Sequence, residues 1–333
     1  MIEASINAFS YVLKGSAAVV RYILRRILFM LPVALLVSFL TFMMIHLIPG
    51  DPARILLGEY ATPQSVAALD RQLGLDKPLP VQFVLWLTQA LSGNLGQSIQ
   101  LQQPVVQAIE QRLPVTVELG VCALLYSLIL AIPLGIYSAT HRNSLGDWLA
   151  NVFSLFSTAI PVFVLGLALI FFFAVAIRLF PPGGYVSFGD DPAGNIRDLI
   201  LPMVTLGTGV VAVNMRQIRA NMVEVLGQDY VRTARAKGLS EQRVAYVHAL
   251  KNAFLPVLTI VGLQIGSILA GAFIVETIFL WPGIGQLTIM SILSKDYPIV
   301  QGVVLLSAFS YMAANLLIDI CYAFLDPRIR FER

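Results

Sequence analysis

Long apolar runs without a charged residue alternate with more polar segments along this chain of 333 residues. Each run is about 17 residues or longer, which is the length that a helix needs to cross the hydrocarbon core of a bilayer. The runs also lack the polar face that a helix carries on the surface of a soluble protein. We count six of them, at residues 27–48, 119–140, 148–177, 199–215, 252–275 and 297–318. The pattern therefore predicts an all-α membrane protein with six transmembrane helices.

Two of the six runs are less regular than the others. The run 199–215 is the weakest, and the run 148–177 is long enough to tilt or to kink at Pro161. The composition agrees with the membrane class, because 57% of the residues are hydrophobic and only 12% are charged, against about a quarter charged in soluble domains. A soluble protein with a large buried core is the alternative, and it would need polar helix faces.

The basic residues predict the orientation of the chain. With six crossings, both ends of the chain and the segment between the fourth and fifth runs lie on the same side of the membrane. This side carries about two thirds of the Lys and Arg residues. An excess of basic residues marks the cytoplasmic side. The N-terminal segment 1–26 and the tail 324–333 are then cytoplasmic. The basic residues are spread over several loops without interleaved aromatic residues, so we expect no nucleic acid as a partner.

One long external segment, residues 49–114, separates the first and second predicted spans. Thr62 followed by Pro63 is a good helix start, for a helix that continues to Leu73. A second amphipathic stretch covers Val81–Leu91 and ends at Ser92-Gly93. The segment is either a helical cap on the outer membrane face or a docking surface for an external partner, and the residues do not decide between these.

Two acidic residues lie at the ends of predicted spans. Glu118 opens the second and Glu276 closes the fifth, and such groups either bond across helices or line a solute path. Trp281, Pro282 and Gly283 follow Glu276 and predict a turn at the external interface, which is either a gate or a structural corner. These five residues are our candidates for a translocation path or gate, with a structural role as the alternative.

The fifth span has a small-residue pattern that predicts close helix packing. Gly262, Gly266 and Ala270 are spaced four apart, which lets two helices approach closely. Motifs for phosphate loops, zinc proteases and nucleophile elbows are absent from the sequence, and its three histidines are scattered. We therefore expect no catalytic residue, no bound metal and no cofactor in this chain.

The segment 229–256 concentrates positive charge in a helical loop. Asp229 is expected to cap a short helix that ends at Ala236, Gly238 to break it in a left-handed conformation, and Ser240 to cap a second helix that runs into the fifth span. Leu239 and Val244 stand in hydrophobic-staple positions of the second helix.

The side chains of the first helix predict how this loop is used. Tyr230 and Ala234 are expected on one side and Arg232 and Arg235 on another, with Thr233 keeping the backbone accessible. The helix has no strong apolar face to insert into lipid. It is therefore better suited to a groove on a cytosolic protein, with Tyr230 as an anchor, than to the membrane surface.

RTARAKG at residues 232–238, with Leu-Pro at 255–256, resembles the cytoplasmic EAA loop of bacterial ABC-importer permeases. Further motifs match the dipeptide/oligopeptide/nickel subfamily, and the chain is similar to its first permease subunit over nearly its whole length. These motifs are HLIPGDPA (46–53), QLGLDKPL (72–79), GNLGQSI (93–99), TVELG (116–120), ETIFLWPGIG (276–285), DYPIVQG (296–302) and DPRIR (326–330). The family's leading Glu-Ala-Ala is replaced here by residues 232–234.

The resemblance implies a type I ABC importer permease fold with a core at residues 112–323 and a coupling loop at about 216–254. It implies a second permease as a heterodimer partner, two cytosolic ABC ATPases that bind ATP and Mg²⁺, and an external solute-binding protein. The chain would lie in the bacterial inner membrane. Asp229 and the residues of the coupling helix, with Gly238 after it, would transmit the motion of one ATPase.

The function that we expect is a membrane half-channel of an ATP-driven importer for a short peptide or peptide-like solute. Nickel or another small solute is the alternative within this family. A self-sufficient secondary transporter or channel is the alternative from another class, and a membrane-embedded enzyme would need a catalytic cluster.

Overall fold

The computed structural model describes residues 2–47, 52–58, 61–73 and 76–325. At some helical positions in these ranges, among them residues 2–22 and 269–271, only the backbone is described. The chain divides into two compact units, Met1–Ala108 with Ser291–Arg333 as unit 1 and Ile109–Met290 as unit 2. Within the described ranges every regular element is a helix, apart from an isolated bridge between Gln97 and Pro104. The prediction of an all-α chain is therefore confirmed.

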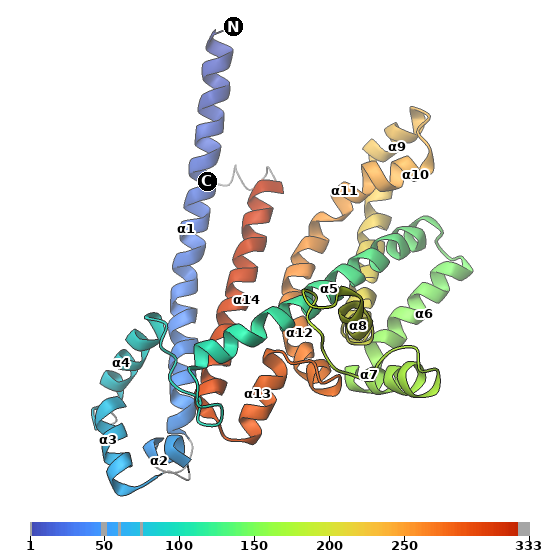
Figure 1. The fold of residues 1–333 in the computed structure, drawn as a ribbon. Coiled ribbons are helices and arrows are strands. Elements are labelled where there is room, and N and C mark those ends of the chain that lie inside the picture. Colours follow the sequence, from blue (N-terminus) through green and yellow to red (C-terminus); the bar gives the residue numbers. More distant parts are fainter. Residues whose placement is uncertain (1, 48–51, 59–60, 74–75, 326–333) are drawn as a thin grey trace. The chain divides into compact units, whose positions relative to one another are not determined.

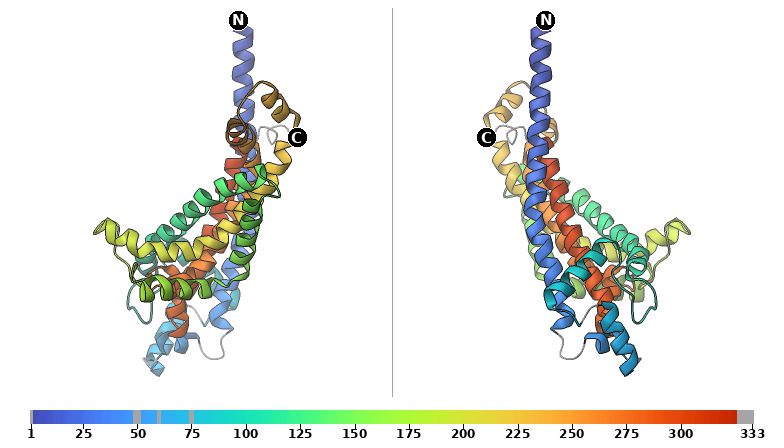
Figure 2. Two further views of the ribbon diagram at one scale, coloured as in Figure 1. Left: turned by 90° about the vertical axis from the view of Figure 1, so that its right-hand side faces the viewer. Right: turned by 90° about the vertical axis from the view of Figure 1, so that its left-hand side faces the viewer.

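Unit 1 is built on two long helices, α1 (Ile2–His46) and α14 (Tyr297–Leu325), which lie side by side (Figure 1; Figure 2). The side-chain amide of Gln301 on α14 donates a hydrogen bond to the backbone oxygen of Thr41 on α1 at 2.9 Å. Since lipid offers no such partner, a polar bond of this kind holds two membrane helices together. Helix α1 continues through residue 26, where the sequence suggested a boundary.

The external segment contains α2 (Pro52–Leu57), α3 (Pro63–Leu73) and α4 (Leu79–Leu91). The predicted start of α3 is confirmed, because the Thr62 hydroxyl oxygen accepts a hydrogen bond from the Ser65 backbone N–H at 3.1 Å. Helix α4 begins two residues before the predicted Val81 and ends at Leu91, as predicted. Imidazole Nε2 of His46 lies 2.9 Å from Oε1 of Gln82, which ties α4 to α1.

A buried carboxylate organises the loop after α4. Asp296 is 1% exposed and precedes α14. Its oxygens accept hydrogen bonds from the Ser98 hydroxyl at 2.5 Å, from the Ile99 N–H at 3.2 Å and from the Gln100 N–H at 3.1 Å. Because a buried charge needs several donors, this arrangement fixes the loop to the start of α14.

Unit 2 contains most of α5 (Val105–Thr140) and the elements from α6 to the greater part of α13. In chain order these are α6 (Leu145–Ala159), α7 (Val162–Leu169), the π-helix η2 (Ile170–Ala176), α8 (Pro192–Leu226), α9 (Asp229–Ala236), α10 (Glu241–Arg243), the π-helix η3 (Val244–Ala249), α11 (Leu250–Ala253), α12 (Leu255–Ile278) and α13 (Ile284–Leu293).

Four described helices are long and apolar enough to cross a membrane, at Ile23–His46, Val105–Thr140, Pro192–Leu226 and Tyr297–Ile318, and the bent pair α6 with α7–η2 adds a fifth. Helix α12 corresponds to the remaining predicted run, 252–275. Only some of the side chains of α12 are described. Helix α8 is far longer than the weak run 199–215 from which it was predicted.

The run 148–177 was expected either to tilt or to kink at Pro161, and the structure has the kink, as a sharp break between α6 and α7. The axes of α6 and of α7–η2 meet at 104°. Pro161 adopts φ −58° and ψ 140°, an extended conformation. Proline cannot donate the helical hydrogen bond and its ring clashes with the preceding turn, so the chain turns there.

Helix α8 is the element around which unit 2 packs. Two close approaches to α5 show this: a Cβ on Gly135 would lie 2.8 Å from Ile218, and a Cβ on Gly207 would lie 2.6 Å from the Tyr126 ring. The hydroxyl of Ser154 on α6 donates to the backbone oxygen of Ala212 at 3.1 Å. Small and polar residues thus bring α5 and α6 against α8 in the way that membrane helices pack.

Candidate functional site

The basic loop forms a helix–turn–helix elbow that comprises α9, the turn at Gly238, α10, η3 and α11. It lies at one end of unit 2, whereas α7 lies at the opposite end (Figure 1; Figure 2). Helix α9 covers the predicted residues Asp229–Ala236, but its N-cap is Gln228 and not Asp229. Gln228 has the extended conformation of a cap, with φ −74° and ψ 151°, so Asp229 becomes the first helical residue. The predicted cap was wrong by one position.

The turn of the elbow is a Schellman motif. Gly238 has φ +78°, the left-handed conformation that was predicted. Its N–H donates to the Arg235 oxygen at 2.9 Å, and the N–H of Leu239 reaches back to the Ala234 oxygen at 3.5 Å. These two bonds satisfy carbonyl groups that the helix end would leave unpaired.

A small apolar cluster closes the elbow from inside. Val231, Ala234 and Val244 are buried, and Leu239 packs against this cluster, in agreement with the hydrophobic-staple positions expected for Leu239 and Val244. Ser240 caps the second helix as predicted and accepts the Arg243 N–H at 3.4 Å. Val231 was not predicted to be part of this cluster, although its i+3 spacing from Ala234 places the two residues on one face of the helix.

Tyr230 lies at the edge of this buried face. Its side chain is 41% exposed, so it does not share the buried position of Ala234. The Asn252 side-chain amide donates to the Tyr230 hydroxyl oxygen at 2.8 Å. The ring is thus held in place by α11 while much of it faces solvent.

The charged side chains of α9 differ in how firmly hydrogen bonds and ion pairs fix them. Arg235 makes two hydrogen bonds to Glu241, at 2.8 and 3.2 Å. Hydrogen bonding to the guanidinium lowers the pKa of Glu241 below its ordinary value and raises that of Arg235. The Arg232 guanidinium lies 3.5 Å from Asp229, with both side chains largely exposed. The Thr233 hydroxyl donates to the Asp229 backbone oxygen at 3.0 Å. Arg232 is therefore the cation of α9 that is most available to a partner.

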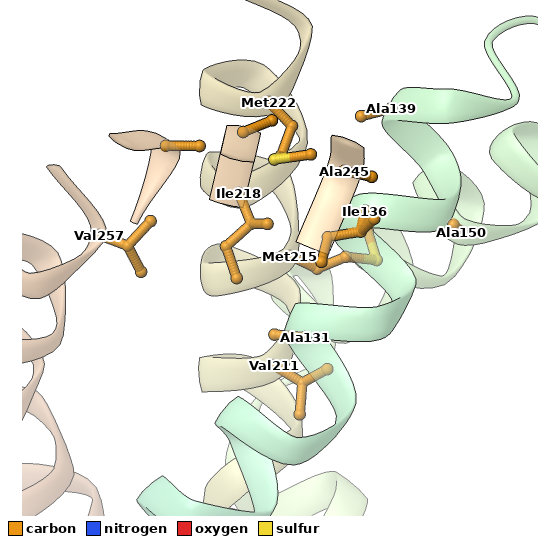
Figure 3. Packing of buried hydrophobic residues seen from close by; sticks show 12 residues of the cluster. Ala131, Ile136, Ala139, Ala150, Val211, Met215, Ile218, Met222, Ala245 and Val257 are labelled. Atoms are coloured by element: carbon orange, nitrogen blue, oxygen red, sulfur yellow. The ribbon is translucent and has the colours of Figure 1, made fainter. Parts of the chain in front are cut away.

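The second arm of the elbow packs on α8. Ala245, Ala249 and Ala253 are buried in one cluster with Met215, Ile218 and Met222 of α8 (Figure 3). Their spacing of four residues forms a stripe of small side chains that lets the two backbones approach. The predicted single helix is interrupted. It consists of α10, the π-helix η3 and α11, and it ends at Phe254, two residues before Pro256 takes the second position of α12.

An ion pair that was not predicted from the sequence ties three helices together near the elbow. Arg219 of α8 donates to both carboxylate oxygens of Asp147 on α6, at 2.8 and 2.9 Å. Ser138 of α5 also donates to Asp147 and accepts a hydrogen bond from Arg219 at 3.0 Å. The sequence feature that could have indicated this ion pair is the arginine itself, because an arginine in an apolar helix needs an acidic partner.

Glu276 lies at the predicted corner and is fully buried. Its carboxylate accepts hydrogen bonds from the Thr116 hydroxyl at 2.7 Å and from the Gln286 N–H at 3.0 Å. A Cβ on Gly283 would lie 2.3 Å from that carboxylate, and one on Gly285 would lie 2.4 Å from Phe273 Cα. The carboxylate thus anchors the first turn of α13, where N–H groups are free to bind an anion.

The rest of the corner is equally close-packed. Trp281 is fully buried, and its indole N–H donates to the Val115 oxygen at 3.1 Å. Pro282 is half-buried beside it. Glu118 accepts hydrogen bonds from Asn195 at 2.7 Å and from the Tyr185 hydroxyl at 3.1 Å. These contacts fit the structural alternative for Glu118, Glu276 and the corner, and a role in a solute path stays a prediction.

The predicted small-residue stripe of α12 falls partly outside the described side chains. Gly262 is buried and Gly266 is half-buried, whereas the Ala270 side chain is not among those described.

A cavity of about 490 Å³ lies between α6, α7, α8 and α12. Its walls are mainly aliphatic, with polar positions at Ser157, Thr205 and Gln264. No sequence pattern pointed to it, because its lining residues come from four separate helices.

Comparison with known proteins supplies the family. Residues 131–331 match the family described as binding-protein-dependent transport system inner membrane component, and residues 19–120 match the N-terminal family of such membrane components. The dipeptide transport system permease protein DppB of Escherichia coli (strain K12) is 41% identical over 94% of this chain and 99% of its own length. A probable peptide ABC transporter permease of Sinorhizobium fredii is 41% identical over 93% and 99%. A putative peptide transport system permease of Brucella abortus is 40% identical over the same shares.

Proposed function

Because this chain belongs to the family of binding-protein-dependent transport system inner membrane components, we propose that it forms one half of the translocation path of an ATP-driven importer for short peptides. The observation that carries the substrate class is the similarity, over nearly the whole length of each chain, to relatives described as dipeptide or peptide permeases. The other half of the path is a second, similar permease. An external binding protein delivers the solute.

The elbow is the element that receives work from a cytosolic ATPase. Three properties support this role. The exposed side chains Tyr230 and Arg232 offer an aromatic ring and a cation to a groove on a partner. The Schellman turn and the Val231 cluster keep the elbow folded, and the alanine stripe seats it on α8. In this proposal, ATP and Mg²⁺ bind to two ATPase subunits and not to this chain.

The elbow and both chain ends face the cytoplasm in this proposal, and the segment 49–114 faces outward. Cysteine labelling tests the orientation. A membrane-impermeant maleimide applied to intact cells stripped of the outer membrane should label Gln97→Cys and leave Arg232→Cys unlabelled until the membrane is opened. Both positions are exposed, so accessibility within the chain does not distinguish them. The reverse labelling would refute the orientation.

The function is tested by reconstitution of the intact complex in proteoliposomes. Uptake of a radiolabelled dipeptide should require ATP and the loaded binding protein. A complex with an inactive ATPase is the matched control. Uptake by this chain alone, without ATPase subunits, would support the self-sufficient transporter instead. Uptake of Ni²⁺ but not of dipeptide would refute the substrate class and leave the ATP-driven mechanism standing.

A further inference from the structure

The cavity between α6, α7, α8 and α12 has the chemistry of a peptide subsite. Most of its wall is aliphatic, including Ile260 and Ile268 of α12 and Val210 and Val213 of α8. Its volume of about 490 Å³ falls within the range of small-molecule sites. We propose that this cavity holds one residue of the peptide during transport, and that the Gln264 amide bonds to the peptide backbone. The inference rests on the proposed function and adds a binding site within this chain.

The amide of Gln264 suits a peptide whatever its side chains. A glutamine offers both an N–H donor and a carbonyl acceptor, which are the two groups that a peptide bond presents. Gln264 is 7% exposed, lies in an apolar membrane helix and lines the cavity. A polar side chain at such a site is costly in lipid, and it is accommodated where it faces protein partners or a path for solute. The aliphatic walls can accept a side chain without selecting one.

Gly209 leaves the cavity open on the α8 side. A Cβ at Gly209 would meet only the Ser157 backbone oxygen, at 4.0 Å, which is ordinary contact. Gly207, two residues away on the same helix, differs, because its Cβ would lie 2.6 Å from the Tyr126 ring. Gly207 is thus required for packing between helices. Gly209 lines the cavity, and its missing side chain keeps space there.

This difference allows a test by filling the cavity without disturbing the packing. Gly209→Ala, Gly209→Val and Gly209→Leu in the intact complex should reduce dipeptide uptake in steps, with Leu reducing it about tenfold or more, equivalent to ~1.4 kcal/mol. The melting temperature of the complex should not fall, because glycine is a poor helix former. Uptake equal to that of the wild type in Gly209→Leu would overturn the subsite.

Removal of the amide gives a second, independent test. Gln264→Leu should lower uptake strongly. Gln301→Leu is the matched control, since Gln301 is also a buried glutamine in a membrane helix but does not line this cavity. After normalisation to assembled complex, Gln301→Leu should transport like the wild type. Equal losses in both variants would mean that Gln264 has no special role with the solute.

The remaining occupant to distinguish is a lipid acyl chain. A dipeptide with a benzophenone side chain, irradiated during turnover, should label residues 205–213 or 260–268, and Gly209→Leu should abolish the label. A co-purified lipid that Gly209→Leu displaces, with uptake unchanged, would overturn the proposal in favour of the acyl chain. Absence of dipeptide uptake by the wild type would refute the proposed function and, with it, the peptide subsite. Wild-type uptake that Gly209→Leu leaves unchanged would refute only the subsite.

Discussion

Replacement of Gly238 tests whether the elbow must stay folded for transport. The residue has φ +78°, and a Cβ there would meet nothing within 4 Å. A substitution therefore costs conformational energy without a steric clash. The left-handed conformation costs an L-residue roughly 1–2 kcal/mol, with β-branched residues at the upper end and asparagine the least affected.

The magnitude follows from these values. Gly238→Ala should destabilise the turn by about 1 kcal/mol and Gly238→Val by about 2 kcal/mol, which lowers the ratio of folded to unfolded elbow by about fivefold and thirtyfold. Gly238→Asn should lie close to the wild type. Because the turn also carries the hydrogen bonds of Arg235 and Leu239, its loss would free the end of α9.

The assay is the number of dipeptides imported per ATP hydrolysed in proteoliposomes. The order wild type, Asn, Ala, Val should be an order of decreasing coupling ratio. Ala236→Val is the control, since it introduces the same side chain at an exposed position of α9, before the left-handed turn. A normal ratio in Gly238→Val would refute the role of the elbow in coupling.

Three further predictions concern buried polar groups. Arg219→Met should destabilise the complex by ~3 kcal/mol because it leaves Asp147 buried without its cation. In a thermal melt, the double variant Asp147→Asn with Arg219→Met should recover part of this loss. An Arg219→Met complex as stable as the wild type would contradict the role of the ion pair. Gly283→Ala should abolish assembly of the complex, as judged by size-exclusion chromatography, because its Cβ would overlap the Glu276 carboxylate. A normal yield of assembled complex would show that the corner at residues 276–283 can rearrange to accept the Cβ. Asp296→Ala should free the loop that begins at Ser98, at a cost of about 1–3 kcal/mol, and make that loop sensitive to limited proteolysis; an unchanged cleavage pattern would refute the anchoring role.

The helices and turns that local rules govern could be predicted from the sequence. Thr62 with Pro63, Gly238 and Ser240 each act within four residues, so capping and left-handed turns are visible in the sequence. The N-cap of α9 was misassigned by one residue. Either Gln228 or Asp229 can stand at the helix start, and only the backbone conformation decides between them.

The contacts between distant residues could not be predicted in the same way. Arg219 and Asp147 are 72 residues apart, and Glu276 and Thr116 are 160 apart. An acidic or basic residue in a membrane helix indicates that a polar partner lies nearby. The sequence allows several partners for each such residue, and only the packing of the helices determines which one it contacts. The cavity is lined by residues on both sides of the break at Pro161. A proline predicts a break in a helix but does not specify its angle, which is 104° here.

Helix α8 connects the elbow with the proposed subsite, and this gives a physical route for coupling. The elbow packs through its alanine stripe on residues 215–222 of α8, and Gly209 lines the cavity on the same helix. The distance along the helix from Gly209 to its end at Leu226 is roughly 25 Å at 1.5 Å per residue. The two prolines of α8, Pro192 and Pro202, lie outside this stretch, so the stretch has no proline kink. Asp147 and Ser138 hold α6 and α5 to the same stretch through Arg219. In the proposed mechanism, a displacement of the elbow would therefore be carried along α8 to the cavity wall, and a change in the cavity would be carried back to the elbow.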